Sequence, residues 1–284
     1  MPVVLAHGSH QLIAVAWRRW EWEPVPVSVI LAASVLYGLG LVHLYRRTGT
    51  GRGVRRWEPL SFYAGLFTIA LAILSPVAWL AEQSLSFHMI QHALLMAVAP
   101  PLLVLGRPIV LFIWSVPRRW RTPLAHRPES AMFLRIWRVL TMPLAVLVLY
   151  AVALWLWHVP AFYDAAVTDE RLHIVEHACF LFSATLFWWT MLHGRFGQFG
   201  YGVAVLCVFL TAMHSGLLGA LLTFQPTLVY RAYDGPARAW GLNPLADQQL
   251  AGLLMWVPFG VLFIVLGLGL LAAWIGQSSR RAMT

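Results

Sequence analysis

The sequence contains very little charge. Aspartate, glutamate, lysine and arginine together make up 11% of its 284 residues, whereas hydrophobic residues make up 60%. A soluble domain carries about 25% charged residues, so this composition excludes an ordinary soluble globular protein. The mean hydropathy of +0.71 and recurring apolar runs of roughly 20 residues indicate a polytopic membrane protein instead.

Lysine is absent, because all 20 basic residues are arginine. We attribute this absence to codon bias rather than to chemistry. The formal net charge of +9 could suggest a nucleic-acid partner, but the arginines cluster in the loops between apolar runs. That distribution is the positive-inside pattern of membrane proteins. The sequence therefore predicts contact with membrane lipids and none with nucleic acid.

Cysteine is also scarce. The two cysteines, Cys179 and Cys207, both lie inside apolar runs, so the sequence does not support a disulfide framework. Each is either a small buried apolar residue or a soft metal ligand. Internal repeats and low-complexity segments are absent too, which indicates one helical domain.

Seven apolar stretches are long enough to cross a membrane as helices. They cover about residues 25–45, 59–80, 86–106, 139–158, 171–193, 199–224 and 247–275. We expect Pro100 and Pro101 to bend or stop the third helix, because proline lacks a backbone donor. The predicted fold class is an all-α bundle of seven transmembrane helices over 25–275. An extracytoplasmic segment, 1–24, which can lie at the interface, precedes it, and a cytoplasmic tail, 276–284, follows it.

The arginines also predict the orientation of the chain. The loops after the first, third and fifth spans, together with the C-terminal tail, contain fifteen of them, and the opposite side contains five. The positive-inside rule then places the N-terminus outside and the C-terminus in the cytoplasm.

With this orientation, six histidines on four helices share the outer half of the membrane. His88 and His92 are four residues apart, as are His173 and His177, so each pair lies on one helical face. A single histidine in a membrane is often a hydrogen-bonded packing residue, but six at one depth favour a metal site. The candidate ligands are His88, His92, His158, His173, His177 and His214. Candidate partners that would fix the imidazole tautomers are Glu176, Asp247 and Gln248.

The residue types leave several metals and functions open. Imidazole suits copper, zinc, iron and nickel, whereas sulfur ligands favour Cu(I). The sulfur-bearing residues near enough in sequence to be considered are Met89, Met213, Met255 and Cys179. The segment HIVEH, from His173 to His177, matches the HxxEH pattern of some zinc proteases, which would make Glu176 a general base. Histidine pairs on facing helices can also hold haem without a covalent attachment motif.

Three blocks of sequence carry a family resemblance. They are FHMIQHALLMAVAPPLLVLGRP, then WHVPAFYDAAV followed by HIVEHACF, and DQQLAGLLMWVP. Together, over roughly residues 25–275, they resemble the CtaG-type cytochrome c oxidase assembly factors of bacteria, the seven-helix family associated with the caa-type oxidase. The matching residues are His88, His92, His158, His173, His177 and Asp247, with His214 as a further match.

The resemblance implies a function that the residues alone leave open. It implies a bacterial plasma-membrane protein that binds copper and delivers it to haem-copper oxidase subunits, as a carrier rather than an enzyme. The alternatives are an intramembrane metal-dependent hydrolase that uses Glu176 with zinc, and a bis-histidine haem protein that transfers electrons. The sequence does not define the oligomeric state.

Overall fold

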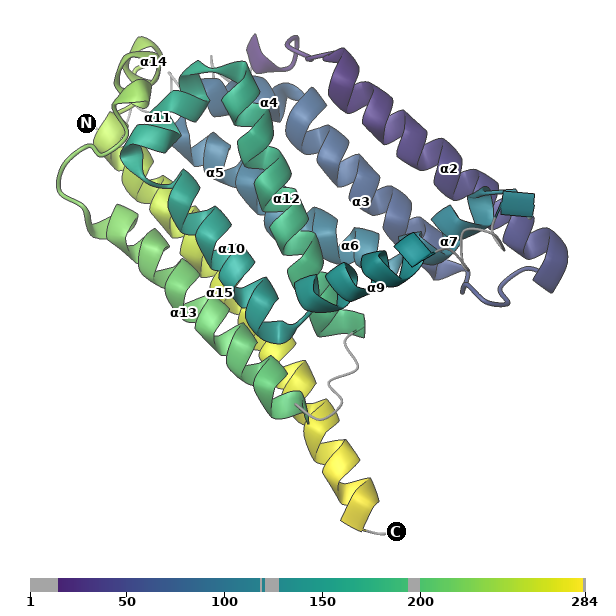
Figure 1. Cartoon of the computed structure of the whole chain (residues 1–284). Helices are drawn as coiled ribbons and strands as arrows, with labels where there is room; N and C mark the ends of the chain where they lie inside the picture. Colours follow the sequence, from purple (N-terminus) through teal and green to yellow (C-terminus); the bar gives the residue numbers. More distant parts are fainter. Residues whose placement is uncertain (1–14, 118, 121–127, 194–199, 283–284) are drawn as a thin grey trace.

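The computed structural model describes residues 15–117, 119–120, 128–193 and 200–282 (Figure 1). Within these ranges every regular element is a helix and no strand occurs, which confirms the predicted all-α class. Among the described residues, six helices are long and apolar enough to cross a membrane, and a seventh span results if one bent pair is counted as a single crossing. The protein is therefore a multi-pass helical membrane protein.

The longer helices form most of the bundle. They are α2 (Pro24–Thr48), α3 (Trp57–Leu74), α12 (Glu170–His193), α13 (Gly200–Phe224) and α15 (Pro244–Ala282). Another span is composite and consists of α5 (Leu85–Ala93), the π-helix η1 (Leu94–Val98) and α6 (Ala99–Leu105). The shorter helices are α4 (Pro76–Gln83), α7 (Pro108–Ser115), α9 (Pro128–Leu140), α10 (Pro143–Trp157), α11 (Pro160–Thr168), the 3-10 helix η2 (Arg231–Tyr233) and α14 (Asp234–Ala239).

Two of the predicted spans are divided differently in the structure. The span expected over 59–80 ends at Leu74, because Ser75 adopts an extended backbone and caps the separate helix α4. The span expected over 139–158 is helix α10, which has only 15 residues and a length of about 22 Å. The preceding helix α9 meets it at 68°. The break falls just before Pro143, because proline disfavours a helical conformation in the residue before it.

The composite span contains Pro100 and Pro101 without ending at them. The stop that the sequence allowed does not occur, because the π-helix η1 leads directly into α6, which has these prolines in its first turn and continues to Leu105. Pro100 has no N–H to offer the carbonyl of Met96, four residues earlier. The indole Nε1–H of Trp188 donates to that carbonyl at 3.1 Å instead. Helix α12, which bears Trp188, therefore supplies the donor for the carbonyl oxygen that Pro100 leaves without one.

Close helix contacts depend on glycine at a few positions. An added Cβ at Gly252 in α15 would lie 2.6 Å from the backbone nitrogen of Thr223 in α13. An added Cβ at Gly40 in α2 would overlap the carbonyl oxygen of Leu111 in α7. Small residues of this kind let transmembrane helices approach each other closely.

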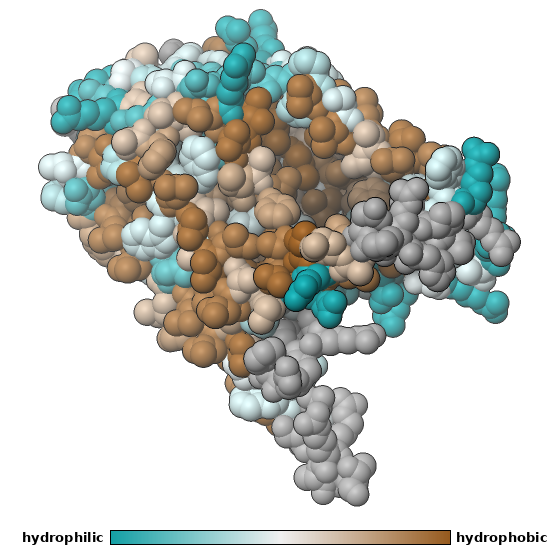
Figure 2. Space-filling view, in the orientation of Figure 1, coloured by the Kyte–Doolittle hydropathy of each residue, from teal (hydrophilic) through white to brown (hydrophobic). Residues whose placement is uncertain are grey.

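The outer surface of the bundle is apolar over the helices. Figure 2 shows hydrophobic residues across the middle of the visible face and hydrophilic residues gathered at its upper rim. Many large apolar side chains on the long helices are exposed, including Phe67, Phe182, Val265 and Leu268. Such a surface suits lipid rather than water. Which end of the bundle faces out of the cell stays a prediction from the arginine distribution.

Candidate metal centre

Four buried side chains from two helices converge at one end of the bundle. His88 and His92 come from α5, and Glu176 and His177 come from α12. One ligand atom of each lies within 4.8 Å of the others. The four residues are between 0% and 8% exposed. We call these four residues the histidine–glutamate cluster.

Most of the polar atoms in this cluster have no hydrogen-bond partner among the described residues. These atoms are both carboxylate oxygens of Glu176, both ring nitrogens of His92, and Nε2 of His88 and His177. Nε2 of His88 lies 3.9 Å from Glu176 Oε2, and Nε2 of His92 lies 3.8 Å from Oε1. These separations are too long for hydrogen bonds. A buried carboxylate without a donor is costly, so either a proton or a cation must neutralise Glu176. The donor set and its unfilled hydrogen-bonding capacity fit a metal ion.

The tautomer of His88 follows from its contact with Tyr233. The Tyr233 hydroxyl donates its only proton to the carbonyl of Ala81, at 2.9 Å. It must therefore accept from Nδ1 of His88, which lies 2.7 Å away. With its proton on Nδ1, His88 has a lone pair on Nε2, and that atom faces Glu176. This arrangement is typical of histidines that bind a metal through one nitrogen while the other is held by a hydrogen bond.

Two further predicted histidines lie beside the cluster. The ring centroid of His173 is 4.1 Å from that of His177 and 5.3 Å from that of His88. The ring centroid of His158 is 6.0 Å from that of His92. Five of the six candidate histidines thus lie together.

The sixth, His214, does not belong to this group. Its described ring contact is with Tyr150 at 6.1 Å, and it is only partly buried.

The structure corrects the expected roles of three acidic and amide residues. Glu176 lies among the four groups that could hold a metal ion, rather than behind an imidazole. The carboxylate of Asp247 accepts hydrogen bonds from the backbone N–H groups of Leu85 and Ser86, at 2.7 and 3.3 Å. Gln248 accepts from the backbone of Val229 at 2.7 Å. Among the described residues neither Asp247 nor Gln248 bonds to an imidazole, and Asp247 instead caps the helix that bears His88 and His92.

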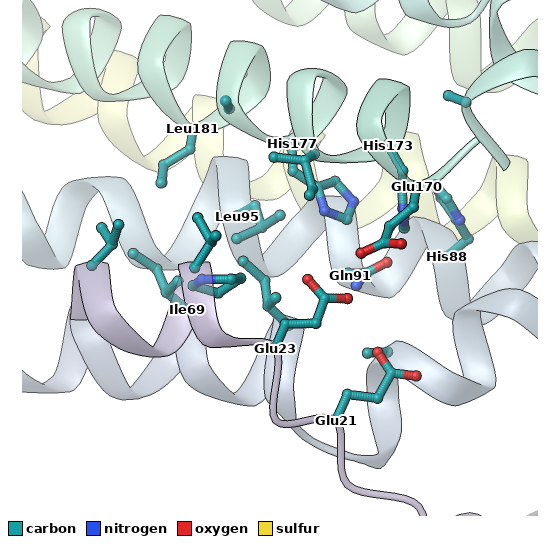
Figure 3. Close-up of a pocket in the computed structure, with 18 of the residues that line it drawn as sticks. Glu21, Glu23, Ile69, His88, Gln91, Leu95, Glu170, His173, His177 and Leu181 are labelled. Carbon is teal, nitrogen blue, oxygen red and sulfur yellow. The ribbon is translucent and has the colours of Figure 1, made fainter. Parts of the chain in front are cut away.

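A large cavity connects the cluster with the end of the bundle. Its volume is about 630 Å³, and we call it the lateral cavity. Its inner wall includes the imidazoles of His88, His173 and His177, while apolar side chains of α2, α3 and α12 line its flank. Figure 3 shows these histidines above the carboxylates of Glu21 and Glu23, with Glu170 beside them. The acidic residues that line this cavity are Glu21, Glu23, Glu82 and Glu170.

The carboxylates of the lateral cavity act on one another electrostatically. The pKa of Glu21 is raised to about 7. The largest cause is partial burial, and the negative charges of nearby carboxylates add to it, namely those of Glu82, Glu23 and Glu170. A cation among these groups would relieve the repulsion between them. Sequence reasoning missed this acidic lining and Tyr233, because their partners lie far away in the chain. The i, i+4 spacing of the histidines and the HIVEH segment that contains Glu176 are signals that the sequence did carry.

Fold and cluster together define a multi-pass helical membrane protein with a buried set of groups that could hold a metal ion. The chain belongs to the family described as Cytochrome c oxidase caa3 assembly factor (Caa3_CtaG), whose model matches residues 35–277. The resemblance found in the three sequence blocks is thereby confirmed.

Curated relatives come from mycobacteria. An uncharacterized protein of Mycobacterium leprae (strain TN) is 24% identical over 280 residues, which cover 93% of this chain and 40% of the relative. An uncharacterized protein of Mycobacterium bovis is 24% identical over 276 residues, with the same coverage. The chain thus spans about 40% of the length of the curated relatives it matches. No solved structure matches it.

Proposed function

We propose that this protein binds copper at the histidine–glutamate cluster and delivers it to a haem-copper oxidase during assembly, in a bacterial plasma membrane. The observation that carries the proposal is the convergence of four buried ligand groups, most of whose polar atoms have no partner, within 4.8 Å. Membership of an oxidase assembly family supports the oxidase as recipient. Imidazole nitrogen is a good ligand for copper.

The surroundings of the cluster suit a carrier rather than a permanent metal store. His173 and His158 lie within one ring contact of cluster members. An ion that leaves one imidazole can therefore bind a neighbouring imidazole directly, and it keeps other ligands throughout the exchange. A carrier needs ligands that bind and then release, and it requires no turnover chemistry.

The lateral cavity supplies a route to the cluster. Its acidic lining attracts cations, and His88 and His177 belong both to its wall and to the cluster. With the N-terminus outside, as the arginines predict, this cavity takes up copper from the extracytoplasmic side. Electrostatic attraction of this kind increases the rate of association more than the final affinity.

Metal analysis of the detergent-purified protein and its variants tests the proposal. We expect His88→Ala, His92→Ala and His177→Ala each to lose bound copper and oxidase maturation while the protein still inserts. His43→Ala and His193→Ala are matched controls. Both histidines lie near the C-terminal ends of their helices, α2 and α12, whereas the cluster lies near the N-terminal end of α12. Both controls should retain copper and maturation. Unchanged copper content in a His88→Ala/His177→Ala double variant would contradict the ligand assignment.

The same preparation separates the alternatives. A hydrolase that uses Glu176 as a general base predicts zinc and loss of turnover on Glu176→Gln. A haem protein predicts the intense Soret and visible bands of haem, which a copper carrier lacks. In cells, deletion of the gene should lower active oxidase while the oxidase genes remain transcribed, and added copper should restore part of the activity.

A further inference from the structure

A second, much smaller cavity lies behind the histidine–glutamate cluster. Its volume is about 10 Å³, which is room for one ion or one water molecule. Three methionines from α5, η1 and α15 contribute to its wall, namely Met89, Met96 and Met255. Two histidines, His92 and His158, also line it, together with the hydroxyl-bearing residues Tyr150 and Ser215. We call this cavity the thioether pocket.

The two histidines of the pocket have unused ring nitrogens. Nδ1 of His158 lies 2.7 Å from the carbonyl oxygen of Leu154, which can only accept, so Nδ1 carries the proton. Nε2 of His158 then has a lone pair, and this buried atom has no described partner. His92 has no described partner on either nitrogen. Each ring can therefore offer a nitrogen to an ion in the pocket.

All three methionines of the pocket are buried. Met89 and Met96 are each 2% exposed, and Met255 is 6% exposed. Methionine does fill core gaps, but here three methionines and two histidines border one ion-sized space. Thioether sulfur selects Cu(I) over harder divalent cations.

We propose that the thioether pocket is a second metal site, selective for Cu(I), with sulfur from the three methionines and nitrogen from His158 and His92. This proposal rests on the proposed function, because it specifies which copper ion the same end of the bundle holds. His92 borders both sites, and because a neutral imidazole has one donor lone pair it serves one ion at a time. Its Nε2 lies 3.8 Å from the carboxylate of Glu176. That carboxylate offsets the charge of a monovalent ion among otherwise neutral ligands.

X-ray absorption spectroscopy of the full chain in detergent, loaded anaerobically with Cu(I) alone, tests the second site. We expect copper–sulfur scattering in the unsubstituted protein. The triple variant Met89→Leu/Met96→Leu/Met255→Leu should lose that scattering and bind one copper ion fewer per chain. Leucine nearly conserves the volume of methionine, so the fold should persist. Met213→Leu is the matched control, because Met213 lies on α13, is 56% exposed and does not border the pocket.

The outcomes separate this inference from the proposed function. Copper bound with nitrogen and oxygen scattering alone would overturn the thioether site and leave the histidine–glutamate cluster intact. Sulfur scattering that survives in the triple variant would also overturn it. Failure of the unsubstituted protein to bind any copper would overturn both proposals. If the triple variant does not fold, His158→Phe provides a second test, and it should weaken Cu(I) binding about tenfold or more in a competition assay.

Discussion

The carboxylate of Asp247 caps helix α5, which bears His88 and His92. A substitution of Asp247 therefore tests whether this cap holds the two histidines in position, whichever metal binds. One carboxylate oxygen accepts from the backbone N–H of Leu85 at 2.7 Å. The other accepts from the backbone N–H of Ser86 at 3.3 Å and from the hydroxyls of Ser84 and Ser86. The carboxylate therefore ties the start of α5 to α15.

The substitution Asp247→Asn removes one of these acceptors. Whichever way the amide is turned, either Leu85 or Ser86 then directs its N–H at an NH₂ group. A hydrogen bond to a charged group contributes about 1.5–3 kcal/mol, and a buried donor without an acceptor costs a similar amount. We expect the free energy of unfolding to fall by about 2–3 kcal/mol. Because α5 bears two cluster histidines, metal affinity should fall about tenfold or more.

Reversible unfolding in mixed detergent micelles measures the first effect, and competition with a metal chelator measures the second. Asp234→Asn is the control, since Asp234 also begins a helix but is 46% exposed and pairs with Arg238 at 2.7 Å. An exposed pair of this kind contributes less than about 1 kcal/mol. If Asp247→Asn matched the control in both assays, the reasoning that links the cap to the cluster would be refuted.

Three further predictions concern orientation, ion capture and packing. Reporter fusions after Arg56 and after Asp169 should report cytoplasm and exterior respectively, and the reverse result would contradict the orientation. Because the pKa of Glu21 is raised to about 7, its carboxylate loses its charge below that pH, so copper loading should slow between pH 8 and pH 6; stopped-flow loading of Glu21→Gln should show a smaller pH effect. Gly252→Ala should destabilise the bundle in an unfolding titration, because its Cβ would overlap Thr223. Gly260→Ala, on the same helix with nothing within 4 Å, should be neutral or stabilising, and equal effects would contradict the packing argument.

The sequence predicted the features that depend on local spacing. Apolar runs located the long helices, and the i, i+4 spacing placed each histidine pair on one face, which is how His88 and His92 come to lie 4.3 Å apart between ring centroids. The break before Pro143 was missed, because hydropathy measures the length of an apolar run and not its straightness.

The details of the site depend on contacts between residues that are far apart in the sequence. Tyr233 is 145 residues from His88, and no local pattern reports that pairing. The sequence predicted that His177 binds the metal and that Glu176 fixes the tautomer of an imidazole. The structure brings both into one group that could hold a metal ion, because α5 packs where its histidines reach each of them. His214 lies on a helix face that contacts Tyr150 instead.

The π-helix η1 has a consequence for the geometry of the composite span. A π-helical turn contains one more residue than the α-helical path would need, and one residue corresponds to about 100° of rotation. The angular phase of α5 relative to α6 is therefore set by the residue count between Leu94 and Val98. Insertion of one residue in this stretch would rotate His88 and His92 away from α12 even if α6 stayed in place. Related chains can thus change the direction of their histidines by changing the length of this stretch, without altering any ligand.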